Sequence, residues 1–173
     1  MRCEPNPTRE HRSVSTGKTP QLSLLTPHAK AGTGLAFDFG EKRVGVAVGD
    51  TAVGIAHPLT TINAADKQRR FAAIAALVGE WQPSQAVVGL PAHLDGTEHE
   101  LSRLARKFAR DLAARFGLPV QFVDERLTSV AADLSLAAAG CAPRKRKSRV
   151  DQVAAQEILQ DYFDTAMRAA RSA

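Results

Sequence analysis

Three carboxylates at distinctive positions in this sequence suggest metal chemistry. Asp38 follows a short apolar run, Glu125 ends the run PVQFVDE, and Asp151 follows a strongly basic segment. Hard cations such as Mg²⁺ bind carboxylate oxygens, usually from one or two side chains together with a substrate phosphate. Two such ions about 4 Å apart can clamp the attacking and leaving oxygens of a phosphodiester. Carboxylates from two strands and a helix are enough to build a site of this kind.

Asp38 and Glu125 have ordinary alternatives. Asp38 could simply form a turn, but it lies between two phenylalanines, and a buried carboxylate is costly unless something pairs with it. By composition, Asp124 is as good a candidate as Glu125. Strand alternation separates the two only weakly: if Phe122 points inward, Asp124 points the same way and Glu125 points to the other face.

The basic segment Arg144–Arg149, RKRKSR, carries five positive charges immediately before Asp151, in a chain of net charge +5. We interpret it as a loop, followed by a helix from about Val150 to Met167. A concentrated basic loop fits a polyanionic partner, with a merely solvated charge run as the alternative. Asp151 also has an alternative role, because Ser148-x-x-Asp151 has the spacing of a capping box at a helix start.

The elements that must position these residues begin with residues 34–50, GLAFDFGEKRVGVAVGD. Two apolar runs joined by a glycine-containing turn predict a β-hairpin. Since both faces of each run are hydrophobic, we expect central, buried strands. A third strand over 57–62 contains Pro58, which is typical of an edge.

The rest of the chain alternates helices and strands. The expected elements are a helix over 66–81, a strand over 85–90, a helix over 98–116, a strand over 119–123 and a short helix over 129–139. Together with the hairpin, this order predicts an α/β three-layer fold with a mixed central sheet. Ligands bind beyond the carboxyl ends of strands in such sheets, which is where Asp38 and Glu125 are expected.

The N-terminal region, residues 1–31, is rich in Pro, Ser and Thr and lacks apolar periodicity, so we expect a disordered extension and a folded domain over 32–168. No apolar run is long enough for a membrane span, and no secretory signal is visible. Two cysteines, Cys3 and Cys141, give no disulfide framework, which is consistent with a cytoplasmic protein. No heptad pattern is present, and we expect a monomer rather than a dimer.

Five motifs in register resemble the YqgF/RuvX family over residues 34 to about 164: LAFDFGEKRVGVAVGD, VVGLPAHLDGTE, ARKFARDL, VDERLTS and VDQVAAQEILQDYF. The resemblance implies an RNase H-like fold, related to Holliday junction resolvases. It also implies a nuclease that processes the 5′ end of the pre-16S rRNA during ribosome biogenesis. The acidic triad of the family falls on Asp38, Glu125 and Asp151, and this match selects Glu125 over Asp124. The resemblance also implies Mg²⁺ or Mn²⁺ as cofactor.

Phosphate contacts are expected around this triad. The resemblance points to Lys42 and Arg43 in the hairpin turn, and to Arg126 and Thr128 after the second carboxylate. The basic segment adds a further group of cations, Arg144, Lys145, Arg146, Lys147 and Arg149. The expected partner is therefore a nucleic acid, either precursor rRNA or branched DNA.

Three functions fit these features. The first is a metal-dependent endonuclease acting on RNA or, as a Holliday junction resolvase in recombination and repair, on branched DNA. The second is a phosphotransferase of the actin and sugar-kinase type, which shares an Asp-x-Gly strand and turn; that class needs two such domains, and this chain has room for one. The third is an RNA-binding module without catalytic activity.

Overall fold

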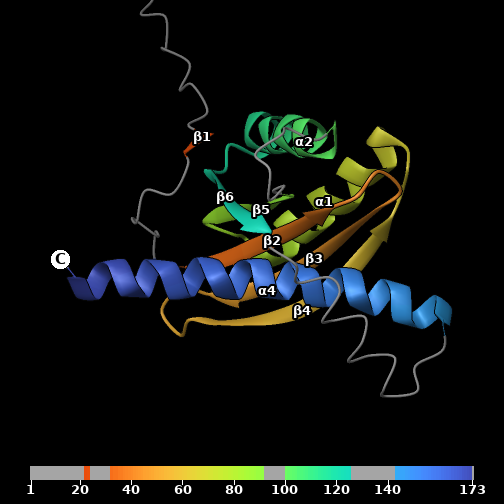
Figure 1. The fold of residues 1–173 in the computed structure, drawn as a ribbon. Coiled ribbons are helices and arrows are strands. Elements are labelled where there is room, and N and C mark those ends of the chain that lie inside the picture. The colour runs from red at the N-terminus through yellow and green to blue at the C-terminus, as the bar shows by residue number, and fades with distance from the viewer. Residues whose placement is uncertain (1–21, 24–31, 92–99, 126–142, 173) are drawn as a thin grey trace, which may run out of the picture.

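The structure, a computed structural model that describes residues 22–23, 32–91, 100–125 and 143–172, is a mixed β-sheet with helices on both faces (Figure 1). Its elements in chain order are β1 (Leu22–Ser23), β2 (Thr33–Phe39), β3 (Arg43–Asp50), β4 (Ile55–Asn63), α1 (Lys67–Trp81), β5 (Gln85–Pro91), α2 (Glu100–Phe116), β6 (Val120–Glu125) and α4 (Pro143–Ser172). Across the sheet the order is β1-β6-β5-β2-β3-β4. The strands β2, β3 and β4 are antiparallel, whereas β5 and β6 run parallel to β2. The predicted α/β three-layer fold with a mixed central sheet is confirmed.

Side-chain alternation along β2 creates two separate cores. Phe37 and Phe39 pack against α1 and α2, where their rings meet the ring of Phe108 at centroid distances of 5.9 and 4.9 Å. Ala36 belongs to the opposite core, which α4 covers with large side chains such as Phe163. Asp38 therefore shares the face of the sheet that carries α4.

Close contact between α4 and the sheet depends on glycine in β3. A Cβ atom at Gly45 would stand 1.9 Å from the carbonyl oxygen of Asp151, and one at Gly49 would stand 2.7 Å from the ring of Phe163. Gly45 is also the cross-strand partner of Asp38. The missing side chain at position 45 thus brings the beginning of α4 next to Asp38.

Glutamines of α4 fix the helix along the edge strand β4. Gln156 donates to the carbonyl of Ala56 at 2.9 Å, and Gln160 donates to the carbonyl of Gly54 at 2.9 Å. The Gln160 side chain also accepts from the backbone N–H of Ala56 at 3.1 Å. Backbone groups on this part of the sheet edge are therefore satisfied by the helix.

The basic segment is helical, which corrects the prediction of a loop over 144–149. Helix α4 begins at Pro143 and ends at Ser172, rather than running from about Val150 to Met167. Proline fits the first turn of a helix, and Lys and Arg are good helix formers. Ser148 is consequently inside the helix, and Asp151 is not part of a capping box.

Two residues of the expected N-terminal extension pair with the sheet. Leu22–Ser23 pairs in parallel with Val120–Gln121, so these two residues of the expected extension belong to the sheet. The physical reason is that β6 would otherwise be an edge strand with free backbone groups. The rest of the extension, both cysteines, the helix expected over 129–139, Arg126 and Thr128 lie outside the described residues.

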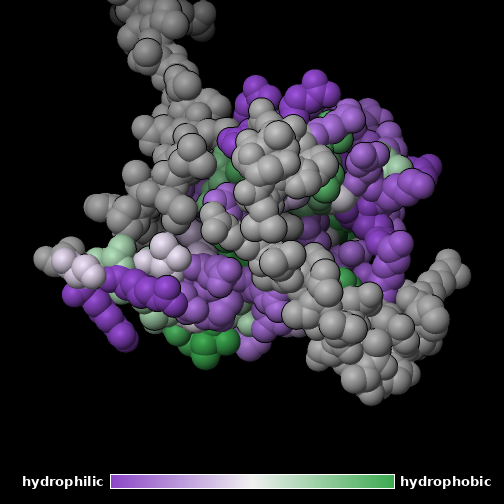
Figure 2. Space-filling view, in the orientation of Figure 1, coloured by the Kyte–Doolittle hydropathy of each residue, from purple (hydrophilic) through white to green (hydrophobic). Residues whose placement is uncertain are grey.

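The surface around α4 is mainly hydrophilic (Figure 2). The large hydrophobic residues that the described chain leaves exposed are Val53 and Ile55, at the turn between β3 and β4. This turn lies at the opposite end of β3 from Asp38 and its neighbours. In the described part of the chain, no helix is long and apolar enough to cross a membrane.

Candidate active site

An open pocket of about 330 Å³ lies where the β2–β3 turn meets α2 and α4. Its lining combines three carboxylates, two cations and an apolar wall: Asp38, Phe39, Gly40, Glu41, Lys42, Arg43, Leu101 and Asp151. Two members of the expected acidic triad thus share one pocket with both expected cations of the turn. An open pocket of this character can admit a charged, extended ligand.

Asp38 is held rigidly in the middle of the sheet, one residue before β2 ends. Burial is the main cause that raises the pKa of this carboxyl from 3.8 to about 6. The negative charge of Asp151 raises this pKa further, and Arg43 lowers it in part. At neutral pH the Asp38 carboxylate is therefore ionised in surroundings that compensate its charge poorly, which favours a bound cation.

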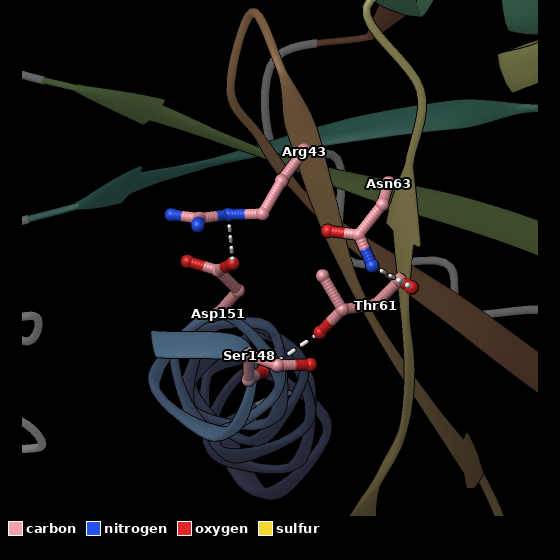
Figure 3. Close-up of polar contacts among 5 residues, drawn as sticks. All are labelled: Arg43, Thr61, Asn63, Ser148 and Asp151. Carbon is pink, nitrogen blue, oxygen red and sulfur yellow. Dashed lines mark hydrogen bonds and ion pairs between the residues drawn. The ribbon is translucent and has the colours of Figure 1, made fainter. Parts of the chain in front are cut away.

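Asp151 lies on the first turns of α4 and forms an ion pair with Arg43 (Figure 3). The Arg43 Nε and Asp151 Oδ2 atoms are 2.8 Å apart. Burial raises the pKa of Asp151, whereas Arg43 and Lys147 lower it. Nearby, Thr61 donates its hydroxyl to the carbonyl of Ser148 at 2.7 Å, which ties the beginning of the helix to β4.

A buried arginine that the sequence patterns did not single out holds the turn that lines the pocket. Arg70 of α1 is 7% exposed, and it donates hydrogen bonds to the carbonyls of Ala64 and Glu41. Its guanidinium lies 5.1 Å from the centroid of the Phe39 ring. Burial lowers the pKa of Arg70. Because Glu41 is in the β2–β3 turn, Arg70 positions the segment that carries Lys42 and Arg43.

The third member of the expected triad is described only through its backbone. Glu125 is the last residue of β6 and pairs with Pro91 at the end of β5. Its side chain lies outside the described residues, as do those of Arg144, Lys145 and Arg146. The competing residue Asp124 is exposed to solvent. Val123, two residues before Glu125, packs in the core under α4.

The described donors are compatible with a hard divalent cation. Within the described ranges, no group of three or more His, Cys, Asp or Glu side chains is placed to hold a metal ion. Asp38 and Asp151 nevertheless supply carboxylate oxygens to one pocket, and Mg²⁺ often takes only one or two protein carboxylates besides water and phosphate. The poorly compensated charge at Asp38 matches this demand.

Without metal, the Asp38 contribution to the free energy of unfolding should fall as the pH rises from about 4 to about 6. The pKa of an aspartate is ordinarily 3.8, and that of Asp38 is about 6 in the folded chain, so the folded state keeps a proton that the unfolded state has released. This contribution is complete below the unfolded pKa and disappears as the pH passes the folded one. Urea unfolding in a chelator across this range measures it. The Asp38→Asn variant should lack this component, and parallel pH profiles for the two proteins would contradict the assignment.

Known proteins are similar to this chain over the elements that form the pocket. The family model described as "RuvX: Holliday junction resolvase" matches residues 32–165. A Methylobacillus flagellatus protein named "Putative pre-16S rRNA nuclease" is 62% identical over 130 residues, 75% of this chain and 89% of its own length. A Chromobacterium violaceum protein of the same name is 62% identical over 131 residues, 75% of this chain and 96% of its own. T. thermophilus RuvC in complex with Holliday junction substrate is similar at 17% identity and a TM-score of 0.46, over 79% of this chain and 96% of that chain.

Proposed function

Because the chain belongs to the RuvX family, we propose that it is a nuclease that hydrolyses phosphodiester bonds with the help of divalent metal ions. The observation that carries this proposal is the pocket in which Asp38 and Asp151 meet Lys42 and Arg43. Carboxylates suit a hard cation, and the neighbouring basic side chains suit the phosphates of a nucleic acid. The relatives named for pre-16S rRNA favour precursor rRNA as the substrate.

The carboxylates have distinct places in this proposal. Asp38 and Asp151 would hold the metal, Asp38 from a rigid central strand and Asp151 from a docked helix. Glu125 would complete the set, since strand alternation gives position 125 the same face as Val123, under α4. Bound Mg²⁺ or Mn²⁺ would polarise the phosphate and lower the pKa of the attacking water.

The cations have the complementary task of holding the nucleic-acid backbone. Lys42 and Arg43 line the pocket itself. Lys147 and Arg149 are exposed on the first turns of α4, close to Asp151 in sequence. Arg144, Lys145 and Arg146 belong to the same helical turns, and Arg126 and Thr128 remain expected contacts beyond β6. Positive charges at these positions would bind the phosphates of a nucleic acid electrostatically.

Neutralising Lys147 and Arg149 to glutamine should weaken nucleic-acid binding and flatten its dependence on salt. Each lost phosphate contact should reduce the slope of log K against log salt by about 0.7 to 0.9. A matched control is Arg168→Gln with Arg171→Gln, which removes two exposed charges from the same helix about 30 Å away from position 147. Titrations at several salt concentrations measure both slopes. Equal slopes for the two double variants would contradict a role for the beginning of α4.

Substrate and metal dependence can be tested together. Chelator-treated protein is incubated with a labelled precursor RNA that spans the mature 5′ end of the small-subunit rRNA, and separately with a four-way DNA junction. We expect RNA cleavage only after Mg²⁺ or Mn²⁺ is added. Cleavage of the junction alone would favour the family's resolvase activity, which needs two active sites and hence a dimer. Binding of RNA without cleavage in either metal would indicate a non-catalytic RNA-binding module.

This assignment also implies a setting for the protein. Processing of precursor rRNA in ribosome biogenesis takes place in the bacterial cytoplasm, and we propose a cytoplasmic protein. A single copy supplies Asp38 and Asp151 to one pocket. We therefore propose that a monomer is sufficient for cleavage of RNA.

A further inference from the structure

We propose that Arg43 serves as an internal counter-ion for Asp151, that a divalent cation displaces it, and that the released guanidinium then binds the substrate phosphate. This inference rests on the proposed metal-dependent function and adds an order of events to it. Its starting point is the 2.8 Å contact between Arg43 Nε and Asp151 Oδ2 at the wall of the pocket.

The first step is the electrostatic state of the pocket without metal. Asp38 and Asp151 line the same pocket, so their negative charges repel each other when both are ionised. Arg43 lines this pocket too and forms the ion pair with Asp151, so its positive charge offsets the repulsion. The guanidinium therefore performs the charge compensation that a bound cation would otherwise provide.

The second step is that guanidinium and metal compete for one carboxylate. A Mg²⁺ ion binds carboxylate oxygens at about 2.0 to 2.1 Å and favours near-ideal octahedral geometry. If it shared Asp151 with Arg43, two cations would lie a few ångströms apart in a half-buried site, where their repulsion is stronger than in water. The Asp151 side chain is 18% exposed, so solvent screens this repulsion only in part.

The third step is that Arg43 has a second task nearby. Its side chain is 30% exposed and begins at the first residue of β3, beside the exposed turn residue Lys42. Once released, it remains at the wall of the pocket that the substrate phosphate would enter. Arginine suits that position because its planar guanidinium can bind two phosphate oxygens at once. Metal loading thereby converts the site from a closed ion pair to one prepared for phosphate.

The test measures Mn²⁺ binding directly, by calorimetry or by the electron paramagnetic resonance signal of the free ion. It uses the chelator-treated full chain without nucleic acid. Arg43→Gln is compared with Lys42→Gln, which removes a neighbouring positive charge that lines the same pocket but forms no ion pair in the described structure with Asp151. We expect Arg43→Gln to bind Mn²⁺ about fivefold more tightly than wild type, the factor equivalent to about 1 kcal/mol. Lys42→Gln should change the affinity by less than half of this factor.

Thermal unfolding provides a second readout that does not depend on catalysis. In chelator, Arg43→Gln should melt below wild type, because Asp151 loses its counter-ion. In saturating Mn²⁺ the difference should close, since the cation replaces the guanidinium. A deficit that persists with metal would mean that Arg43 has a purely structural role.

The outcomes separate this inference from the function on which it rests. Mn²⁺ binding by wild type with equal affinities in Arg43→Gln and Lys42→Gln overturns the counter-ion role and leaves metal-dependent cleavage intact. If neither wild type nor Arg43→Gln binds Mn²⁺, both the inference and the proposed metal dependence are wrong. If Arg43→Gln binds Mn²⁺ and wild type does not, the result supports competition between Arg43 and the metal ion for Asp151.

Discussion

The Gly45→Ala variant is expected to lose cleavage and to unfold about 3 kcal/mol more easily than wild type. The new Cβ would stand 1.9 Å from the backbone carbonyl oxygen of Asp151, where no flexible side chain can yield. The beginning of α4 would have to move away from β3, and Asp151 would leave the pocket with it. Urea unfolding measures the loss of stability, and Mn²⁺ binding together with the RNA cleavage assay measures the loss of the site.

A second glycine in the same chain provides the control. Gly79 is exposed on α1, and a Cβ there would have no neighbour within 4 Å. Gly79→Ala should therefore keep full activity and gain about 0.5 to 1 kcal/mol, because alanine restricts the unfolded chain and favours the helix. If Gly45→Ala retained Mn²⁺ binding and unfolded like wild type, the close packing of α4 on β3 would not be needed for the site.

The Asp38→Asn variant is expected to abolish cleavage while binding of nucleic acid and folding are kept. Asparagine preserves the shape of the side chain but removes the charge that would hold the metal. Removing a negative charge cannot repel phosphate, so the affinity for RNA should be unchanged or higher. In chelator near pH 8 the variant should be about 2 kcal/mol more stable than wild type, because burial and Asp151 disfavour the ionised carboxylate. Near pH 4 this gain should vanish.

Asp124→Asn is the matched control for the acidic site. Asp124 is exposed at the end of β6, and the same substitution there should leave cleavage nearly unchanged. Glu125→Gln should resemble Asp38→Asn. If Asp124→Asn were as damaging as Glu125→Gln, or if Asp38→Asn retained full metal-dependent cleavage, the proposed carboxylate set would be wrong.

Much of the architecture follows from local patterns in the sequence. The apolar runs around Asp38 predicted the central hairpin, because strands that are hydrophobic on both faces must be buried. The helix over 66–81 was expected from its periodicity, and the structure has α1 at Lys67–Trp81 with Asp66 as its N-cap. Asp38 itself was identifiable because a carboxylate between two phenylalanines in a buried strand is costly without a partner.

Other features depend on contacts between distant residues, which local patterns do not contain. The run RKRKSR lacks apolar residues, so nothing in its periodicity indicated a helix, and its helical state continues the packed part of α4. Gly45 was visible as a glycine in a strand, but the helix backbone against it was not. Arg70 resembled an ordinary surface charge beside Arg69, although its guanidinium is buried against carbonyls of two other segments.

The docking of α4 on the sheet also determines when during synthesis the chain can become active. Asp38 and Asp151 are about 110 residues apart in sequence, and they share a pocket only after the helix has packed on β3. Closing so long a loop is entropically costly and depends on the last described element of the chain. A nascent chain held on the ribosome before α4 has emerged carries Asp38 but no Asp151. It therefore cannot assemble this pocket while translation of the domain is still in progress.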